Sequence, residues 1–142
     1  MSPPIYTTAL DAEAAFYKAL THGDLDALMS VWSEDEEVVC VHPTGLRIVG
    51  LAAVRETWRQ IFSGGIALEI DIGQAVVSAS AAMAVHSVIE RIGIAGESGH
   101  IAPVAATNVY VRGAHGWRMV LHHASLLPEP GDFGELSPRV VH

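Results

Sequence analysis

The spacing of the hydrophobic residues changes at Gly64-Gly65, and this change limits the fold classes open to the chain. Before the pair, apolar residues recur every three or four positions, as on one face of a helix: Leu51, Val54, Trp58, Ile61 and Phe62. After the pair, apolar residues alternate with small or polar ones, as in a strand with one buried face: Ile66, Leu68, Ile70 and Ile72. Helices followed by strands predict an α+β domain whose helices gather on one face of a curved, mostly antiparallel sheet and leave a pocket.

Two more helices are predicted near the N-terminus. Thr8 and Asp11 can cap the first, and Gly23 suits a left-handed stop, so we expect a helix over about 9–22. Its apolar face is expected to carry Leu10, Ala14, Tyr17 and Leu20. Asp24 can cap a second helix at once, and residues at helical spacing follow it: Leu25, Leu28, Met29 and Trp32.

Strand signals occupy most of the rest of the chain. Val38 to Val41 has the composition of a strand, the segment PTG turns the chain, and LRIV can return as a second short strand. The strand that begins at Ile66 changes phase at Gly73, which predicts a bulge or bend there. Three more strands are predicted near 82–94, 103–112 and 117–126, and an irregular tail at about 127–142. The prediction is one domain that spans 1–142.

Composition excludes some classes of protein. The 142 residues carry a formal net charge of −8 and only eight Lys and Arg, too few for a surface that binds nucleic acid. No apolar stretch approaches the roughly 18 residues of a membrane span, and no secretory signal is visible, so we expect a cytoplasmic protein without a membrane partner. Cys40, the single cysteine, has apolar flanks that predict a buried and inert thiol.

Three histidines are candidates for a site. Proline restricts the residue before it to extended geometry, so His42, before Pro43, is expected at the end of a strand, where it has either a structural role or a place in the pocket. His122 and His123 are neighbours in a strand and must point to opposite faces of the sheet. Because His123 shares its parity with apolar residues, we predict that His123 faces inward, although a bend in the strand would alter that parity.

Other candidates are weaker. Glu90 shares a strand face with His86. If that face is inward, Glu90 either needs a partner to stay charged or becomes an acid with a raised pKa, and we expect instead an ordinary ion pair with Arg91 or Arg112. The three tryptophans are expected in the core, with a pocket wall as the alternative: Trp32, Trp58 and Trp117. The chain carries no HExxH or CxxC pattern, no glycine-rich phosphate loop and no GxSxG elbow, so we expect no metal and no cofactor.

Two blocks of sequence carry a resemblance to a known family. Residues 16–62 contain, in order, GDL, a tryptophan, HP-G, a glycine and W-IF, and residues 116–125 read GWRMVLHHAS. The chain resembles the nuclear transport factor 2-like superfamily in its SnoaL-like and ketosteroid isomerase-like branch. The resemblance implies a cone-shaped bent sheet and three helices around an apolar cavity, and often a homodimer. Members of this superfamily include isomerases, cyclases, dehydratases and many proteins that are not enzymes.

The resemblance also implies roles for particular residues. In ketosteroid isomerases, an aspartate before the proline of this turn moves a proton between carbons of the substrate, and His42 stands at that position. The tyrosine that donates to the enolate oxygen would fall at Phe16, with Tyr17 one step away, and Asn108 is the nearest polar candidate for the second donor.

The resulting prediction is a protein that binds a small apolar molecule. As an enzyme, it would be an isomerase, cyclase or dehydratase that moves a proton next to a carbonyl, with His42 as base and Tyr17, Asn108 or His123 as oxyanion donor. The cavity is expected to be lined by Phe16, Tyr17, Trp32, Trp58 and Asn108. Two alternatives stay open: a binding module without catalysis, and a dimerisation or association domain whose cavity has no ligand.

Overall fold

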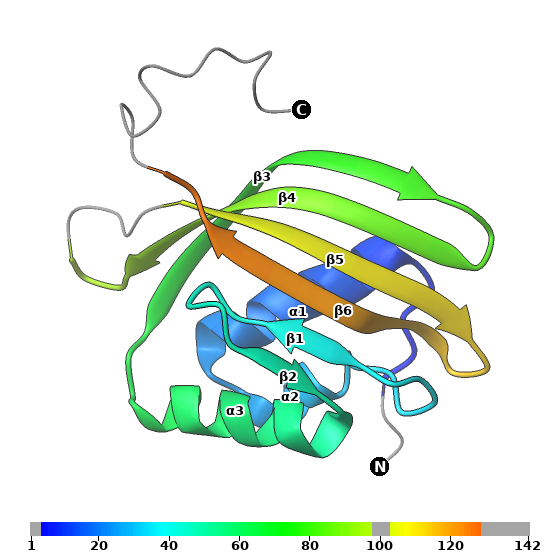
Figure 1. Ribbon diagram of the computed structural model, residues 1–142, viewed down its shortest axis with the longest axis horizontal. Helices are drawn as coiled ribbons and strands as arrows, with labels where there is room; N and C mark the ends of the chain where they lie inside the picture. The colour runs from blue at the N-terminus through cyan, green and yellow to red at the C-terminus, as the bar shows by residue number, and fades with distance from the viewer. Residues whose placement is uncertain (1–3, 98–102, 129–142) are drawn as a thin grey trace.

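Three helices from the first half of the chain pack against one face of a six-stranded sheet (Figure 1). The computed structural model describes residues 4–97 and 103–128. The helices are α1 (Ala9–His22), α2 (Leu25–Met29) and α3 (Leu51–Ser63). The strands are β1 (Val39–Val41), β2 (Arg47–Val49), β3 (Leu68–Ala79), β4 (Met83–Ile94), β5 (Val104–Gly113) and β6 (Gly116–Leu126). The predicted α+β class is confirmed.

The ends of the first two helices follow from local sequence. The Thr8 side chain accepts a hydrogen bond from the Asp11 backbone N–H at 3.0 Å, and Gly23 ends α1 in the left-handed region with φ 62°. The Asp24 side chain caps α2 by accepting from the Ala27 N–H at 3.1 Å. This helix ends at Met29, before Trp32, which instead forms an isolated bridge with a residue of β6.

The apolar face predicted for α1 was partly wrong. Leu10 is 64% exposed and Ala14 is exposed, whereas Glu13 and Phe16 are buried with Tyr17 and Leu20. Helix α1 is rich in alanine, and alanine side chains mark the buried stripe too weakly for the spacing alone to fix it. The helix is therefore rotated relative to the prediction and turns Glu13 toward the sheet.

The sheet has the strand order β2-β1-β6-β5-β4-β3. Every neighbouring pair is antiparallel except β1 with β6, so the predicted mostly antiparallel sheet is confirmed. We call the face that packs against the helices the inner face and the opposite one the outer face. The register between β3 and β4 shifts between Gly73 and Val76, which confirms the predicted bulge.

A second bulge, in β6, decides which histidine faces inward. Val109 lies opposite Leu121 while Tyr110 lies opposite Met119, so Val120 is an extra residue without a partner. An extra residue reverses the side-chain alternation beyond it. His122 is therefore buried on the inner face with Met119, and His123 is exposed. The prediction that His123 faces inward was wrong.

The core lies between α1 and the sheet and is built around Phe16. The Phe16 ring meets Tyr17, Trp32 and Trp58 edge to face, at 5.0 to 6.3 Å between ring centroids. Trp32 and Trp58 are buried in the core as predicted, whereas Trp117 is only partly buried. No helix among the described residues has both the length and the apolar character needed to cross a lipid bilayer. Most of the predicted irregular tail, from residue 129 onward, lies outside the described residues.

Candidate functional site

A row of polar side chains crosses the inner face of the sheet. His86 on β4 lies opposite Asn108 on β5, Asn108 lies opposite His122 on β6, and His122 lies opposite Cys40 on β1. Residues directly opposite each other on neighbouring strands project from the same face. All four side chains are buried, with Asn108 at 0% and His122 at 3% exposure. The sheet thus holds a line of hydrogen-bonding groups inside the core.

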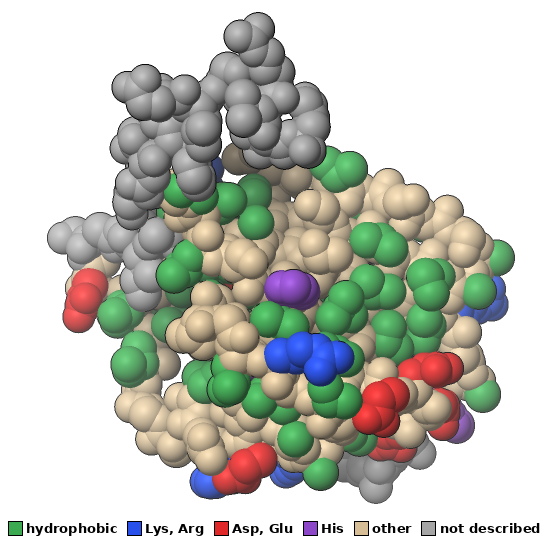
Figure 2. Space-filling model, in the orientation of Figure 1, with side chains coloured by type: hydrophobic (Ala, Val, Ile, Leu, Met, Phe, Trp, Pro, Cys, Tyr) green, Lys and Arg blue, Asp and Glu red, His purple; other side chains and the backbone are tan. Residues whose placement is uncertain are grey.

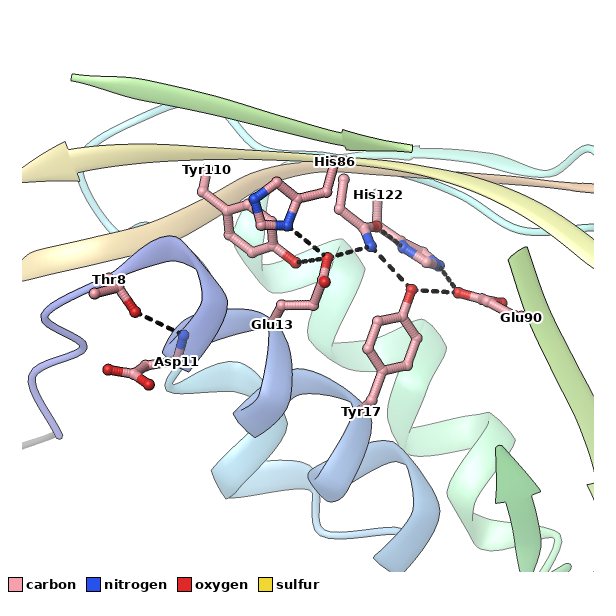
Figure 3. A network of polar contacts seen from close by, with 9 residues as sticks. Thr8, Asp11, Glu13, Tyr17, His86, Glu90, Tyr110 and His122 are labelled. Carbon is pink, nitrogen blue, oxygen red and sulfur yellow. Dashed lines mark hydrogen bonds and ion pairs between the residues drawn. The ribbon is translucent and has the colours of Figure 1, made fainter. Parts of the chain in front are cut away.

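Helix α1 adds a carboxylate to this row. Glu13 Oε2 accepts hydrogen bonds from the Tyr110 hydroxyl at 3.0 Å and from Asn108 Nδ2 at 3.3 Å, and His86 Nδ1 lies 3.0 Å from the same oxygen (Figure 3). Since a carboxylate oxygen only accepts, His86 is also a donor here. Three donors compensate the buried Glu13 for the water that it has lost.

Tyr17, one turn further along α1, connects this carboxylate to a second one. Its hydroxyl accepts from Asn108 Nδ2 at 2.9 Å and donates to Glu90 Oε2 at 2.6 Å (Figure 3). Burial raises the pKa of Glu90 to about 7, and the hydrogen bond from Tyr17 works against this rise. Burial and the neighbouring Glu90 raise the pKa of Tyr17, so its hydroxyl stays protonated.

The environment of Glu90 bears on the alternatives that the sequence left open. Glu90 faces inward and is 2% exposed, whereas Arg91 and Arg112 are exposed. The carboxyl contacts Tyr17 in place of either arginine. The raised-pKa alternative is therefore the one the structure supports, and the expected ion pair with Arg91 or Arg112 was wrong.

His122 sits between Asn108 and Glu90. Its Nδ1 lies 2.6 Å from Asn108 Oδ1, and its Nε2 lies 4.0 Å from Glu90 Oε2. Burial, together with the nearby His42 and His123, lowers the pKa of His122 to about 3. The ring is consequently neutral at physiological pH, and its unprotonated nitrogen can accept a hydrogen bond.

His42 lies at the end of β1, as predicted. Its backbone N–H donates to the Leu46 carbonyl at 3.0 Å and its own carbonyl accepts from the Gly45 N–H at 2.7 Å, which closes the turn. The side chain is 6% exposed and packs on Trp58, with ring centroids 4.9 Å apart. Burial lowers the pKa of His42, so this ring too is mainly neutral.

Two polar groups beside His42 complete the surroundings. Cys40 Sγ lies 3.6 Å from His42 Nε2, and burial raises the pKa of this thiol to about 12, in line with the predicted inert cysteine. The buried N–H of Trp58 forms no hydrogen bond of ordinary geometry.

The structure brings most of the predicted site residues together and separates one of them. His42 and four of the five expected lining residues surround the same interior: Phe16, Tyr17, Trp58 and Asn108. Trp32 touches Phe16 but also borders a different hollow, and His123 lies on the outer face. Sequence reasoning missed Glu13 and Tyr110. A charged residue four positions before Tyr17, and so on the same helix face, was the available signal for Glu13.

Two hollows lie away from this interior. One, of about 370 Å³, is bordered by Trp32, Asp35, His115 and Arg118 among others, and one of about 230 Å³ by Tyr6 and residues of α1 and α2. The predicted apolar cavity stays a prediction. Partly buried apolar side chains pack against the hydrophobic core: Phe62, Ile70, Ile72 and Ile92. Within residues 4–97 and 103–128, no three potential metal ligands are grouped to hold an ion.

Comparisons with known proteins agree with this architecture. The family model described as SnoaL-like domain matches residues 10–129. A protein from Thiobacillus denitrificans, provisionally named a calcium/calmodulin-dependent protein kinase type II association domain, is 37% identical over 88% of this chain and 99% of its own, with a TM-score of 0.77. A protein from Streptomyces avermitilis, provisionally named a dehydratase of the NTF2-like family, is 28% identical over 83% of this chain and 92% of its own, with a TM-score of 0.74.

A third structure supports the fold alone. It is an NTF2-like protein of unknown function from Pseudomonas putida, 17% identical over 86% of each chain, with a TM-score of 0.75. No protein with a curated description matches the sequence.

Proposed function

Because the chain belongs to the SnoaL-like domain family and buries an acid–base group at the centre of its fold, we propose that it is an enzyme that moves a proton on a small apolar organic molecule. The reaction class is isomerisation, cyclisation or dehydration. The observation that carries the proposal is the inward-facing Glu90, whose pKa of about 7 lets it give or take a proton near neutral pH.

The neighbouring groups supply complementary roles. His42, whose pKa is lowered by burial, is the base, because an imidazole that is neutral near pH 7 can accept a proton. Tyr17 is the oxyanion donor, and Asn108, whose two amide hydrogens go to Tyr17 and Glu13, positions the Tyr17 hydroxyl. In the resting state, the Tyr17 hydrogen is held by Glu90, and it becomes free for a substrate oxygen once Glu90 is protonated.

Apolar side chains beside Glu90 suit an apolar substrate. Ile72 on β3 lies directly opposite Glu90, and Ile70 lies opposite Ile92 on the same inner face. These side chains and Phe62 of α3 keep part of their surface exposed while they pack on the core. An apolar molecule that covers them would gain about 25 cal/mol for each Å² of apolar surface buried. The Streptomyces avermitilis relative, named a dehydratase, is consistent with this reaction class.

The test combines ligand binding with turnover. Purified protein is titrated with flat, apolar carbonyl and hydroxy compounds while tryptophan fluorescence is followed, since Trp58 packs on His42. We expect saturable binding in the wild type and in Glu90→Gln and His42→Ala, with turnover lost in both variants. Glu69→Gln, an exposed glutamate on β3, is the matched control and should retain turnover. Unchanged turnover in Glu90→Gln, or no binding to any compound, would contradict the proposal.

A homodimer formed through the outer face is a second proposal, compatible with the first. A row of partly buried apolar residues crosses this face from β1 to β4: Val39, Leu121, Val109 and Val85. Figure 2 shows hydrophobic side chains gathered over these strands. Contiguous apolar surface of this kind marks interaction sites, and the Thiobacillus denitrificans relative is named an association domain.

Light scattering after size exclusion tests this dimer. We expect a dimeric wild type, and a monomeric Val109→Lys variant because the new charge would lie in the interface. Leu10→Lys places the same charge at an exposed position on α1 and should leave the dimer intact. A monomeric wild type, or a dimeric Val109→Lys variant, would contradict the assignment of this face.

A further inference from the structure

The donors and acceptors of the hydrogen bonds around Asn108 determine which nitrogen of His122 carries the proton. Asn108 Nδ2 donates to both Tyr17 and Glu13, while Asn108 Oδ1 faces His122 Nδ1 at 2.6 Å (Figure 3). We propose that Glu13 is a positioning residue that acts through Asn108: it fixes the orientation of the amide, so that His122 carries its proton on Nδ1 and turns a bare Nε2 toward Glu90. The consequence for turnover rests on the proposed function, whereas the protonation pattern of the ring does not.

The first step concerns the hydroxyl of Tyr17. It has one hydrogen, which is donated to Glu90 at 2.6 Å, so the 2.9 Å contact with Asn108 must be one in which Tyr17 accepts. The atom of Asn108 at that contact is therefore the amide nitrogen. The amide oxygen then faces His122, and a short contact between this oxygen and Nδ1 requires a hydrogen on Nδ1.

The second step explains why an anchor is needed. Without Glu13, the same chain of groups could run in reverse. A protonated Glu90 could donate to Tyr17, Tyr17 could donate to the oxygen of a rotated Asn108, and the amide nitrogen could donate to a bare His122 Nδ1. Both directions use the same number of hydrogen bonds along Glu90, Tyr17, Asn108 and His122, so these four groups alone select neither.

Glu13 excludes the reversed set of hydrogen bonds. Rotation of the amide would bring Asn108 Oδ1 to about the place of Nδ2, which lies 3.3 Å from Glu13 Oε2, and two acceptors would then face each other with no hydrogen between them. Glu13 cannot easily turn away, because its Oε2 is held by Tyr110 and His86 at 3.0 Å each. The buried carboxylate thus holds the amide in one orientation.

The result is a defined pair of groups at the proposed site. A neutral ring with its proton on Nδ1 has a lone pair on Nε2, which lies 4.0 Å from Glu90 Oε2. This distance is too long for a hydrogen bond, so Glu90 does not occupy the lone pair. His122 then presents a free hydrogen-bond acceptor at the proposed site, and its ring packs on Phe16 with ring centroids 5.0 Å apart.

Nuclear magnetic resonance of protein labelled with ¹⁵N at histidine tests the inference directly, without substrate. The chain has eight histidines, and loss of one pair of signals in His122→Gln assigns those of His122. We expect the wild type at about pH 7 to show a protonated Nδ1 and an unprotonated Nε2. A ring protonated on Nε2, or on both nitrogens, would overturn the inference.

Removal of the anchor provides the second measurement. In Glu13→Leu, we expect the two ¹⁵N signals of His122 to move toward each other as both tautomers become populated. If that variant does not fold, Glu13→Gln gives the same readout, because an amide can turn either its oxygen or its nitrogen toward Asn108. Glu69→Gln is the matched control and should leave the signals unchanged. A folded Glu13 variant that keeps the wild-type signals would overturn the role of Glu13.

The outcomes separate this inference from the proposed function. The expected tautomer in a protein that binds and converts nothing would refute the enzyme and leave the role of Glu13 intact. Turnover that depends on Glu90, in a protein whose His122 has the opposite tautomer, would support the enzyme and overturn the role of Glu13.

Discussion

The Glu90→Gln variant should be more stable relative to the wild type at high pH than at low pH. The folded state raises the pKa of Glu90 from the ordinary 4.5 to about 7 because the carboxyl is buried. Between these values, the folded protein binds a proton that the unfolded chain has released. Wild-type stability therefore falls as the pH rises through this range, and a neutral glutamine removes that loss.

The size of the effect follows from the same two pKa values. At about 1.4 kcal/mol for each pH unit, the difference between 4.5 and about 7 corresponds to about 3 kcal/mol. Glu90→Gln keeps the size of the side chain and an oxygen that can accept from Tyr17. The free energy of unfolding of Glu90→Gln minus that of the wild type should therefore be about 3 kcal/mol larger at about pH 9 than at about pH 4.

Urea denaturation followed by tryptophan fluorescence measures the difference across this pH range. His42 and His122 are present in both proteins, so their titrations largely cancel in the comparison. The exposed Glu69, changed to Gln, should give a difference from wild type that does not vary with pH. If the Glu90→Gln and wild-type curves stay parallel within about 1 kcal/mol, burial does not perturb Glu90 and the argument for an acid–base group near neutrality fails.

Three further predictions concern stability. His122→Ala should lower the free energy of unfolding by about 2–3 kcal/mol because it leaves Asn108 Oδ1 buried without its partner. In the same denaturation assay, His123→Ala, at an exposed position, should change it by no more than about 0.5 kcal/mol, and equal costs would contradict the bulge at Val120. The pKa of His122 is lowered from 6.5 to about 3, so between these values the unfolded chain binds a proton that the folded protein does not, and stability falls as the pH drops through this range. Circular dichroism against pH should show that His122→Gln loses less stability there than the wild type. Thr8→Ala removes the cap of α1 and should cost about 1 kcal/mol in thermal unfolding; no change would mean that water replaces the cap.

The elements that sequence reasoning located well are those whose causes are local. The cap at Thr8 and the stop at Gly23 each act within one turn of the chain, and both ends of α1 agree with the prediction. The change from helical spacing to alternation at Gly64-Gly65 likewise needs only neighbouring residues. The phase shift at Gly73 was visible because the apolar residues themselves changed position there.

The site was harder to predict because its residues meet through strand register. His86, Asn108 and His122 stand on three strands, and only the register places them side by side. The bulge at Val120 left no trace in composition, since Val120 and Leu121 are both apolar and the alternation reads equally well with either phase. His123 was favoured over His122 for this reason. Glu13 was missed because the alanine-rich helix gave no clear apolar face.

The polar row also affects which register the sheet adopts. A one-residue slip of β5 against its neighbours would turn Asn108 to the outer face and bring a residue of the opposite face inward. Tyr110, which also lies on the inner face of β5, would turn outward together with Asn108. The buried Glu13 would then keep only its contact with His86, and the Tyr17 hydroxyl would lose its donor. Buried polar groups without partners cost about 1–3 kcal/mol each, so apolar residues at these positions would discriminate less strongly between registers. The contacts that set the protonation of His122 therefore also disfavour a misaligned sheet, and substitutions at Asn108 should change register stability and the proposed chemistry together.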